Sequence, residues 1–447
     1  MDIRFDFSLV LGKNLRSGDG LAAHDLRKGL RRAEKAALAV ARRHAGGEIG
    51  FPDLPFLEME TRRLSRDAAK IRKRFTHMLV LGIGGSALGT KAVLEGIGGP
   101  GARKGLALTV SDNVDPDAFF PLLRSQPMKT TAVVAVSKSG GTAETNEQLA
   151  LSIDALKKAN GRSWKEHLIL ITDPSMGAFR RMAQEEGITS YPIPPNVGGR
   201  FSVLSPVGLF PLAAAGVSAE KLLQGARGME NLFRRRKPEN NPVLFASAVY
   251  AHYLLANPKP VQVWMTYGQG LERVAEWWQQ LWAESLGKLR PDGKPVGQTP
   301  ARAVGVTDQH SQVQLYQDGP PDKIYTFIKW RKGNLAMPGG KALRDLFEAE
   351  FEGTIGALWN AGRPIVRIEI GARDEAHIGA FLHFWEWVTA VVGESAGINP
   401  FDQPGVEEGK KITRALMGEK GASALRERFL RKMRSRAPAE IRIRGND

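Results

Sequence analysis

Cysteine is missing altogether from the 447 residues of this sequence. Disulfide bridges, iron–sulfur clusters and cysteine-ligated zinc are therefore excluded. Apolar runs approaching the ~20 residues of a membrane-spanning helix are missing as well. Asp2 and Asp6 stand at the start of the sequence, where a secretory or transit leader would carry basic and apolar residues. These absences lead us to expect a cytoplasmic protein without a membrane span.

Basic charge is in excess, with a formal net charge of +16. The excess gathers in residues 26–46, whose apolar spacing is helical, and in residues 426–444. Neither segment carries a zinc-finger spacing, an aromatic RNA-reading motif or basic-zipper heptads. We therefore favour a solvated basic surface that attracts small anionic substrates over dedicated nucleic-acid binding.

Apolar strands alternate with helical segments along most of the chain, which has a hydrophobic content of 42%. Strands are expected over residues 77–81, 105–112, 131–137, 167–172, 261–267, 323–330 and 364–370, and helices over 86–97, 144–159, 177–187, 271–287 and 377–397. Continuous apolar strands separated by helices are typical of parallel sheets covered on both faces. We predict an α/β fold with two doubly wound parallel sheets and helical N- and C-terminal segments.

The proline-containing stretch 233–242 separates two rounds of this alternation. We predict an N-terminal helical segment over residues 1–70, a first domain over 71–235, a second domain over 236–420 and a basic C-terminal segment over 421–447. The length is sufficient for two or three ordinary domains.

The stretch VSKSGGT, which begins at Val136, places many hydrogen-bond donors directly after the strand 131–137. Ligands of open α/β sheets bind beyond the carboxyl ends of the strands, where a following helix offers free N–H groups. Hydroxyl donors come from Ser137, Ser139 and Thr142, and Lys138 adds a positive charge. The order of glycine, lysine and serine differs from a Walker A loop. We predict a phosphate-binding loop.

A second glycine turn, GIGGSALG at residues 82–89, also follows a strand. Its third glycine is out of place for a dinucleotide fingerprint, and no acidic residue clearly ends the next strand. A nicotinamide site is therefore disfavoured, and two serine-bearing turns on parallel strands indicate a sugar phosphate. A tight structural turn is the competing explanation for either loop alone.

Four polar clusters are candidates for chemistry. Arg200 follows two glycines, His310 lies among amides in a segment of little periodicity, and Lys410 is expected one or two turns into a helix after Pro404. Glu284 lies four residues after Gln280, on the same face of an aromatic-rich helix. Singly, each is better explained without chemistry, as a surface ion pair, a satisfied histidine or a solvated lysine.

Taken together, the ordered segments GIGGS, SKSGGT, NVGGRFSVLSPVG, QLWAESLGK, TDQHSQ and DQPGVEEGK resemble the glucose-6-phosphate isomerase family in its shorter bacterial form. The resemblance runs from about Met78 to about Lys410. It implies two sugar isomerase (SIS) domains, no metal or redox cofactor, and interconversion of glucose 6-phosphate and fructose 6-phosphate in glycolysis and gluconeogenesis. One departure is Gly141, because short bacterial members usually have a threonine there and a hydroxyl donor is missing.

The resemblance also assigns roles to individual residues. Glu284 matches the base that moves a proton through a cis-enediolate, Arg200 matches the residue that stabilises the enediolate, and His310 and Lys410 match the pair linked to ring opening. The remaining matches are Ser137, Lys138, Ser139 and Thr142 for the phosphate, and Gly85, Ser86, Gln280 and Gln403 for the sugar. Glu284 can serve two adjacent carbons only if it is within hydrogen-bond reach of both.

The family resemblance further implies a homodimer in which His310 enters the partner's site. A histidine that serves its own chain's site is the alternative. For the function, the alternatives are a related SIS enzyme acting on another sugar phosphate, a sugar-phosphate-sensing regulator, and a nucleic-acid-binding protein supported only by charge. A related SIS enzyme should lack the GGRFS and QPGVE segments, and a regulator should lack the pair of Glu284 and Lys410.

Overall fold

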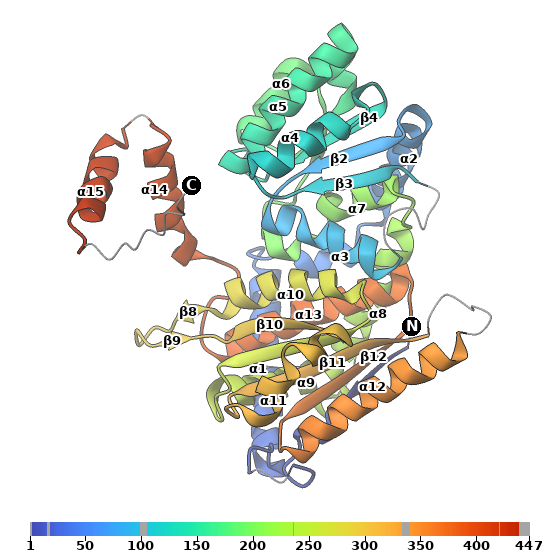
Figure 1. The fold of residues 1–447 in the computed structure, drawn as a ribbon, viewed down its shortest axis with the longest axis vertical. Helices are drawn as coiled ribbons and strands as arrows, with labels where there is room; N and C mark the ends of the chain where they lie inside the picture. The colour runs from blue at the N-terminus through green and yellow to red at the C-terminus, as the bar shows by residue number, and fades with distance from the viewer. Residues whose placement is uncertain are drawn as a thin grey trace, which may run out of the picture. The chain divides into compact units, whose positions relative to one another are not determined.

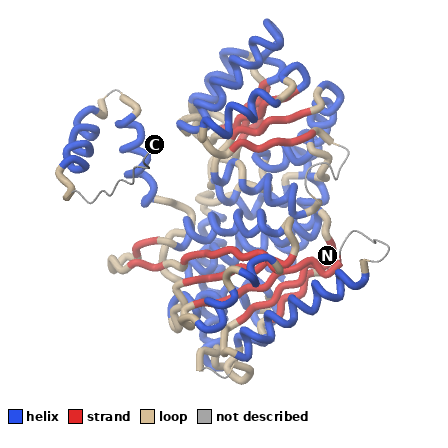
Figure 2. The backbone as a smooth tube through the Cα atoms, viewed as in Figure 1, coloured by secondary structure: helices blue, strands red, loops and turns tan. Residues whose placement is uncertain are grey.

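The computed structural model describes residues 2–15, 18–98, 105–235, 237–332, 340–419 and 421–437 (Figure 1). The chain divides into two compact units, Met1–Phe401 and Asp402–Asp447. Within the described ranges, no helix combines the length and the apolar character needed to cross a bilayer. Both main sheets lie in the first unit, where helices surround them (Figure 2).

The first sheet has five strands in the order β3-β2-β4-β5-β6, and every neighbouring pair is parallel. Its strands are β2 (His77–Leu81), β3 (Ala107–Ser111), β4 (Thr131–Val136), β5 (Leu168–Thr172) and β6 (Thr189–Pro192). This order turns back between β2 and β4, so the loops after these two strands leave in different directions and open a crevice. The two glycine turns predicted to bind a sugar phosphate follow these two strands.

The second sheet has the order β1-β12-β11-β7-β10. Its strands are β1 (Ile3–Asp6), β7 (Val261–Tyr267), β10 (Thr299–Gly305), β11 (Lys323–Lys332) and β12 (Ile365–Ala372). All pairs are parallel except that of β1 with β12. The prediction of an α/β fold with two parallel sheets is confirmed, whereas β1 and β10 were not predicted. The domain boundaries given above stay a prediction.

Helices form layers on both faces of the two sheets. The helices of the first unit are α1 (Ala23–Ala45), α2 (Glu58–Arg74), α3 (Leu88–Gly96), α4 (Pro116–Ser125), α5 (Ala143–Asn160), α6 (Ala178–Glu186), α7 (Pro206–Ala214), α8 (Ala219–Arg235), α9 (Pro242–Leu255), α10 (Leu271–Leu286), α11 (Val313–Asp318), α12 (Lys341–Asn360) and α13 (Glu375–Ser395). Short 3-10 helices are η1 (Ser8–Val10), η2 (Phe51–Phe56), η3 (Gly84–Ser86), η4 (Met128–Thr130), η5 (Gly161–His167), η6 (Gly199–Phe201), η7 (Pro238–Asn240) and η8 (Thr307–His310), and β8 (Lys288–Leu289) pairs with β9 (Pro295–Val296). Helices α4, α5 and α6 cover the outer face of the first sheet, and α11 and α12 that of the second (Figure 1).

Alternation along the strands divides the apolar residues among three clusters. In β2, Met78 and Val80 face the central cluster, while Leu79 belongs to the cluster under α4, α5 and α6. In β7, Trp264 faces the centre, while Val263 belongs to the cluster under α11 and α12. Successive strand residues point to opposite faces, so both sheets share one central helical layer that includes α3, α10 and α13.

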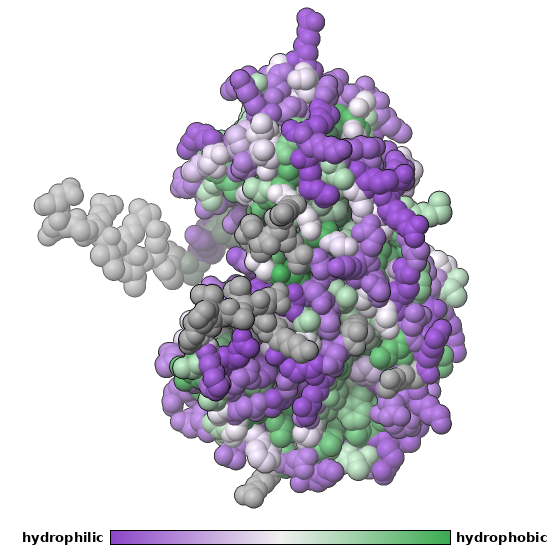
Figure 3. All heavy atoms as spheres, turned by 90° about the vertical axis from the view of Figure 1, so that its right-hand side faces the viewer, coloured by the Kyte–Doolittle hydropathy of each residue, from purple (hydrophilic) through white to green (hydrophobic). Residues whose placement is uncertain are grey.

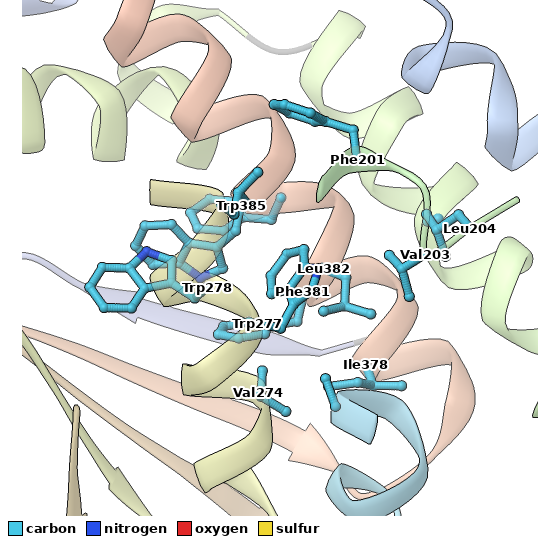
Figure 4. Close-up of a cluster of buried hydrophobic side chains, with 14 of the residues drawn as sticks. Phe201, Val203, Leu204, Val274, Trp277, Trp278, Ile378, Phe381, Leu382 and Trp385 are labelled. Atoms are coloured by element: carbon cyan, nitrogen blue, oxygen red, sulfur yellow. The ribbon is translucent and has the colours of Figure 1, made fainter. Parts of the chain in front are cut away.

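Aromatic packing in that central layer fixes the helix that carries Glu284. Figure 4 shows side chains from α10, from α13, from η6 and from the segment that follows η6 meeting in one cluster: Val274, Trp277, Trp278, Ile378, Phe381, Leu382, Trp385, Phe201, Val203 and Leu204. The indole rings of Trp264 and Trp278 stack with centroids 4.2 Å apart. Truncating a buried tryptophan to alanine costs about 3–5 kcal/mol, so this stack holds α10 firmly against β7.

A buried ionic cluster lies between α8 and α13. His383 Nε2 is 2.7 Å from Glu230 Oε2, its Nδ1 is 3.1 Å from Glu386 Oε2, and the three side chains are fully buried. Trp387 Nε1 donates a further hydrogen bond to Glu230 Oε2. Burial alone would lower the pKa of His383, but its hydrogen bonds with Glu230 and Glu386 outweigh that effect and raise it to about 9. The imidazolium therefore stays charged inside the core at neutral pH.

The second unit consists of η9 (Pro404–Val406), α14 (Glu407–Leu416) and α15 (Ser423–Arg434). As predicted, a helix begins shortly after Pro404 and carries Lys410. The predicted basic segment 426–444 falls partly in α15, and residues 438–447 lie outside the described residues. On the side of the molecule that faces the viewer in Figure 3, hydrophilic side chains predominate, as a solvated charged surface requires.

Candidate active site

The loop after β4 forms a compact turn in front of α5. Ser137 Oγ accepts a hydrogen bond from Gly140 N at 3.1 Å and lies 3.1 Å from Thr142 Oγ1, so the turn is closed by its own hydroxyls. Gly140 has φ +64°, and a Cβ there would lie 2.5 Å from Phe179 N. Only glycine suits both the conformation and the space.

Thr142 caps α5, a helix of 18 residues, without a hydrogen bond from its side chain to the first turn. The first N–H groups of the helix therefore point toward the loop together with the positive end of the helix dipole. The exposed Ser139 hydroxyl accepts from Gly141 N at 3.1 Å and keeps its own proton for another acceptor. This geometry suits a phosphate group.

Lys138 adds positive charge to this loop. Its Nζ donates to the carbonyls of Pro195 at 2.5 Å and Val197 at 3.1 Å. An ammonium group has three donors, so one is left for a ligand once these two are used. Partial burial lowers the pKa of Lys138, and the nearby carboxylate of Asp173 opposes that shift. The ammonium is held by neutral carbonyls, so an arriving anion would neutralise it.

The loop after β2 approaches the Arg200 segment very closely. A Cβ on Gly85 would lie 2.2 Å from the carbonyl carbon of Gly199, so glycine is required for the two loops to touch. A Cβ on Gly84 would lie 2.7 Å from Gln280 Nε2. The half-buried Ser86 belongs to the same turn, η3. The structure thus brings the predicted sugar-binding residues Gly85, Ser86 and Gln280 together.

Glu284 lies in the last turn of α10, on the face predicted from the spacing. Its Oε1 accepts from Gln280 Nε2 at 3.1 Å, and its Oε2 is 3.5 Å from Arg200 Nη1. The Glu284 side chain is 34% exposed, whereas that of Arg200 is 2% exposed. The carboxylate is therefore open to a ligand while the guanidinium beside it is fixed.

Several groups hold Arg200 in place. Besides Glu284, its Nε donates to Ser285 Oγ at 2.7 Å, and its Nη2 donates to the carbonyl of Pro400 at 2.6 Å. Ser285, which directly follows Glu284, is a positioning residue that the sequence analysis missed; its place next to the predicted base was the available signal. The carbonyl of Pro400 belongs to the backbone, so no residue type in the sequence indicates that it accepts a hydrogen bond from Arg200.

The phosphate loop and the Arg200 segment are linked through Lys138. Val197, whose carbonyl accepts from Lys138, precedes Arg200 by three positions. Three residues span at most about 11 Å, so the carbonyl that accepts from Lys138 and the guanidinium beside Glu284 belong to one short segment.

His310 lies far from Glu284 within the same chain. Helix α10 runs antiparallel to β10, because Glu272 pairs with Arg302 at 3.6 Å while Gln279, seven residues later, bonds the carbonyl of Pro300 at 3.0 Å. Glu284 therefore lies beyond the start of β10, whereas His310 follows its end. A seven-residue strand is about 23 Å long, and the two side chains are separated by roughly that length.

The segment around His310 is helical rather than irregular. Residues 307–314 show little periodicity in the sequence, but Thr307–His310 form η8 and α11 begins at Val313. Helices of four and six residues are too short to show a hydrophobic period. The His310 side chain is exposed, and among the described residues it has no hydrogen-bonding or ionic partner.

Gln403 and Lys410 belong to the second unit. There, Lys410 Nζ is 2.9 Å from Glu407 Oε1, and this hydrogen bond lowers the pKa of Glu407. Both lysine and glutamate side chains are about half exposed. Their predicted roles beside Glu284 stay predictions.

Clusters of three or more histidine, aspartate or glutamate side chains suited to a metal ion are not found in the described parts of the chain. Two parallel sheets around a shared helical layer, with a glycine turn before the N-terminus of α5 and a carboxylate beside a buried guanidinium, define a doubly wound α/β protein.

Comparison with known proteins shows to which family of doubly wound α/β proteins this chain belongs. The Phosphoglucose isomerase family model matches residues 63–328. The chain is 39% identical to glucose-6-phosphate isomerase of Carboxydothermus hydrogenoformans over 96% of this chain and 98% of that protein. It is 38% identical to a Thermus thermophilus enzyme of the same name over 84% of this chain and 92% of that protein. The chain belongs to the phosphoglucose isomerase family.

Solved structures share the fold of this chain. A hypothetical protein from Thermus thermophilus superposes with a TM-score of 0.84 and 34% identity, covering 93% of this chain and 100% of that one. A glucose-6-phosphate isomerase from Chlamydia trachomatis superposes with a TM-score of 0.72 and 24% identity, covering 84% of this chain and 77% of that one. The second likeness supports the fold.

Proposed function

We propose that this protein interconverts glucose 6-phosphate and fructose 6-phosphate, with Glu284 as the base. The observation that carries the proposal is the accessible Glu284 carboxylate, 3.5 Å from the buried Arg200 guanidinium. Membership in the family supports the same reaction. An aldose–ketose isomerisation of this kind moves protons within one molecule, so the chemistry needs neither a metal nor a redox cofactor.

In the proposed step, Glu284 removes the proton from the second carbon of the open-chain aldose and returns it to the first carbon, while the hydroxyl proton on the oxygen of the second carbon passes to the oxygen of the first. The electron pair of the broken C–H bond forms the cis-enediolate, whose negative charge lies on oxygen. Arg200 is already fixed by Ser285 and Pro400, so it stabilises that charge without having to reorganise. Gln280, bonded to Glu284, keeps the carboxylate pointed toward the sugar.

The phosphate is proposed to sit in the loop Ser137–Thr142, bound by Lys138, by the Ser139 and Thr142 hydroxyls and by the first N–H groups of α5. The dianion is far from the reacting carbons, so this contact anchors both ground and transition states. Gly141 offers no hydroxyl, which leaves backbone donors and the other side chains to complete the site.

Ring opening is proposed to require His310 and Lys410, with Gln403 contacting the sugar. One of the pair protonates the ring oxygen while the other helps to deprotonate the anomeric hydroxyl. Because His310 lies roughly a strand length from Glu284 of its own chain, we propose a homodimer in which it enters the partner's site. The exposed His310 and the 53% exposed Leu315 on the adjoining α11 support a contact there.

The alternatives predict different behaviour. A related SIS enzyme would act on another sugar phosphate, a regulator would bind without turnover, and a nucleic-acid-binding protein would stay on heparin in the presence of phosphate. Glycolysis and gluconeogenesis in the cytoplasm are proposed as the setting, because both sugar phosphates are made and consumed there. The decisive test is a coupled assay in which fructose 6-phosphate is supplied and newly formed glucose 6-phosphate is oxidised; binding without product formation would refute the proposal.

A further inference from the structure

The turn of residues 399–401, at the end of the first unit, helps to position Arg200. Arg200 Nη2 donates to the carbonyl of Pro400 at 2.6 Å. On either side of that carbonyl, Asn399 Oδ1 accepts from the backbone N–H of Phe401 at 3.1 Å, which closes the turn. The direction of the Pro400 carbonyl, and with it the position of the guanidinium, depends on this turn keeping its shape.

The side chain of Arg43, near the end of α1, binds the same turn. Its Nη2 donates to Asn399 Oδ1 at 2.9 Å, and its Nη1 donates to Glu394 Oε1 at 2.9 Å. The guanidinium also lies over the ring of Phe401, with Cζ 5.1 Å from the centroid. One planar cation thus connects the end of α13, the asparagine that closes the turn, and the aromatic residue that follows Pro400.

The remaining contacts explain why arginine is needed at this position. Arg43 Nε is 3.1 Å from Glu48 Oε2, and the Arg43 side chain is only 25% exposed. A guanidinium presents several donors in a fixed plane and stacks on aromatic rings, whereas an ammonium is a point charge. Lysine could keep one of these partners but could not hold Glu394, Asn399 and Glu48 in a fixed arrangement.

We propose that Arg43 is a positioning residue for the isomerisation, which acts on Arg200 through Asn399 and the Pro400 carbonyl. This inference rests on the proposed function. The inference assigns a role in the reaction to one residue of the basic helix α1, whose positive charge is otherwise explained as a solvated surface. Arg43 itself touches no reacting atom: its effect is to keep Arg200 where the enediolate oxygen develops.

The test is Arg43→Lys in the full-length protein, with Arg42→Lys as its control. Arg42 is the neighbouring arginine on α1, is exposed, and has no ionic or side-chain hydrogen-bonding partner among the described residues. Misplacing a catalytic group by about 1 Å costs up to ~10²-fold in rate, so kcat of Arg43→Lys should fall about 10- to 100-fold. KM for fructose 6-phosphate should stay near the parent value, because the phosphate loop is intact. Arg42→Lys should match the parent in both constants.

A double-mutant cycle separates this inference from the proposed function. In an Asn399→Ala background, Arg43→Lys should add little further loss of kcat, because both changes release the same turn. Additive losses, a rise in KM without loss of kcat, or a folded Arg43→Lys variant with parent kcat would each overturn the inference. Failure of the proposed function would be recognised earlier, because the parent protein itself would form no glucose 6-phosphate.

Discussion

Replacing Glu284 with glutamine tests the proposed base directly. Glutamine keeps an oxygen that can accept from Gln280, but its amide cannot take up a proton and presents N–H groups to Arg200. The ion pair that is lost joins a buried guanidinium to a carboxylate that is 34% exposed. Arg200 keeps its hydrogen bonds to Ser285 Oγ and the Pro400 carbonyl, so the variant should fold and bind sugar phosphate nearly as the parent does.

The rate should respond much more strongly than the stability. Loss of a general base typically costs ~10²–10⁴ in rate, equal to about 2.7–5.4 kcal/mol of activation free energy at 1.36 kcal/mol per tenfold. We expect kcat to fall by at least this much, because no other carboxylate was assigned to the same proton. The coupled assay from fructose 6-phosphate measures kcat, and incorporation of solvent deuterium into the sugar measures the proton transfer itself.

Glu272→Gln is the matched control for this prediction. Glu272 lies on the same helix, pairs with Arg302 and has a side chain that is 38% exposed. It should retain parent kcat. If Glu284→Gln exchanged deuterium at the parent rate, Glu284 would not be the base, whatever happened to the overall turnover.

Three other perturbations test separate parts of the structure. Ser137→Ala and Thr142→Ala should mainly raise KM, with free phosphate inhibiting competitively; a collapsed kcat at normal KM would show that the loop does more than anchor. Glu284→Ala and His310→Ala, inactive alone, should regain activity after joint unfolding and refolding, because a hybrid dimer with shared sites leaves one site intact; inactive hybrids would refute the shared site. The pKa of His383 is raised to about 9. Its contribution to stability is therefore complete below its unfolded pKa of about 6.5 and is lost as pH rises through about 9, a change of about 3 kcal/mol. His383→Gln should remove this change from the pH dependence of the free energy of unfolding.

The sequence predicted the elements whose residues are apolar without interruption. β4 and β7 are buried along nearly their whole length, so their strand character is visible locally. β1 and β10 escaped prediction because each is short of apolar residues and owes its structure to pairing with a distant strand: β1 with β12, and β10 with β7. η8 was missed for the separate reason that a single helical turn has no period.

The candidate site likewise combines contacts that the sequence predicted with contacts that it could not predict. The spacing of Gln280 and Glu284 predicted a shared helix face, and their side chains are hydrogen-bonded. Spacing could not predict that Arg200, 84 positions earlier, pairs with Glu284. That contact depends on the packing of α10 against η6, and on a backbone carbonyl at Pro400 that the sequence gives no sign of.

The position of β1 at the edge of the second sheet affects how the protein is made. β1 pairs with β12, and the backbone N–H of Asp2 bonds His377 Nε2, 375 positions later. At about 5–20 residues per second, synthesis leaves this segment without its partner for roughly 20 to 75 s. An unpaired strand can pair with a neighbouring chain, and the charges of Arg4 and Asp6, which alternate with Ile3 and Phe5, counteract such pairing. Replacing both charges with threonine should therefore increase aggregation during expression while leaving the unfolding temperature of the finished protein nearly unchanged.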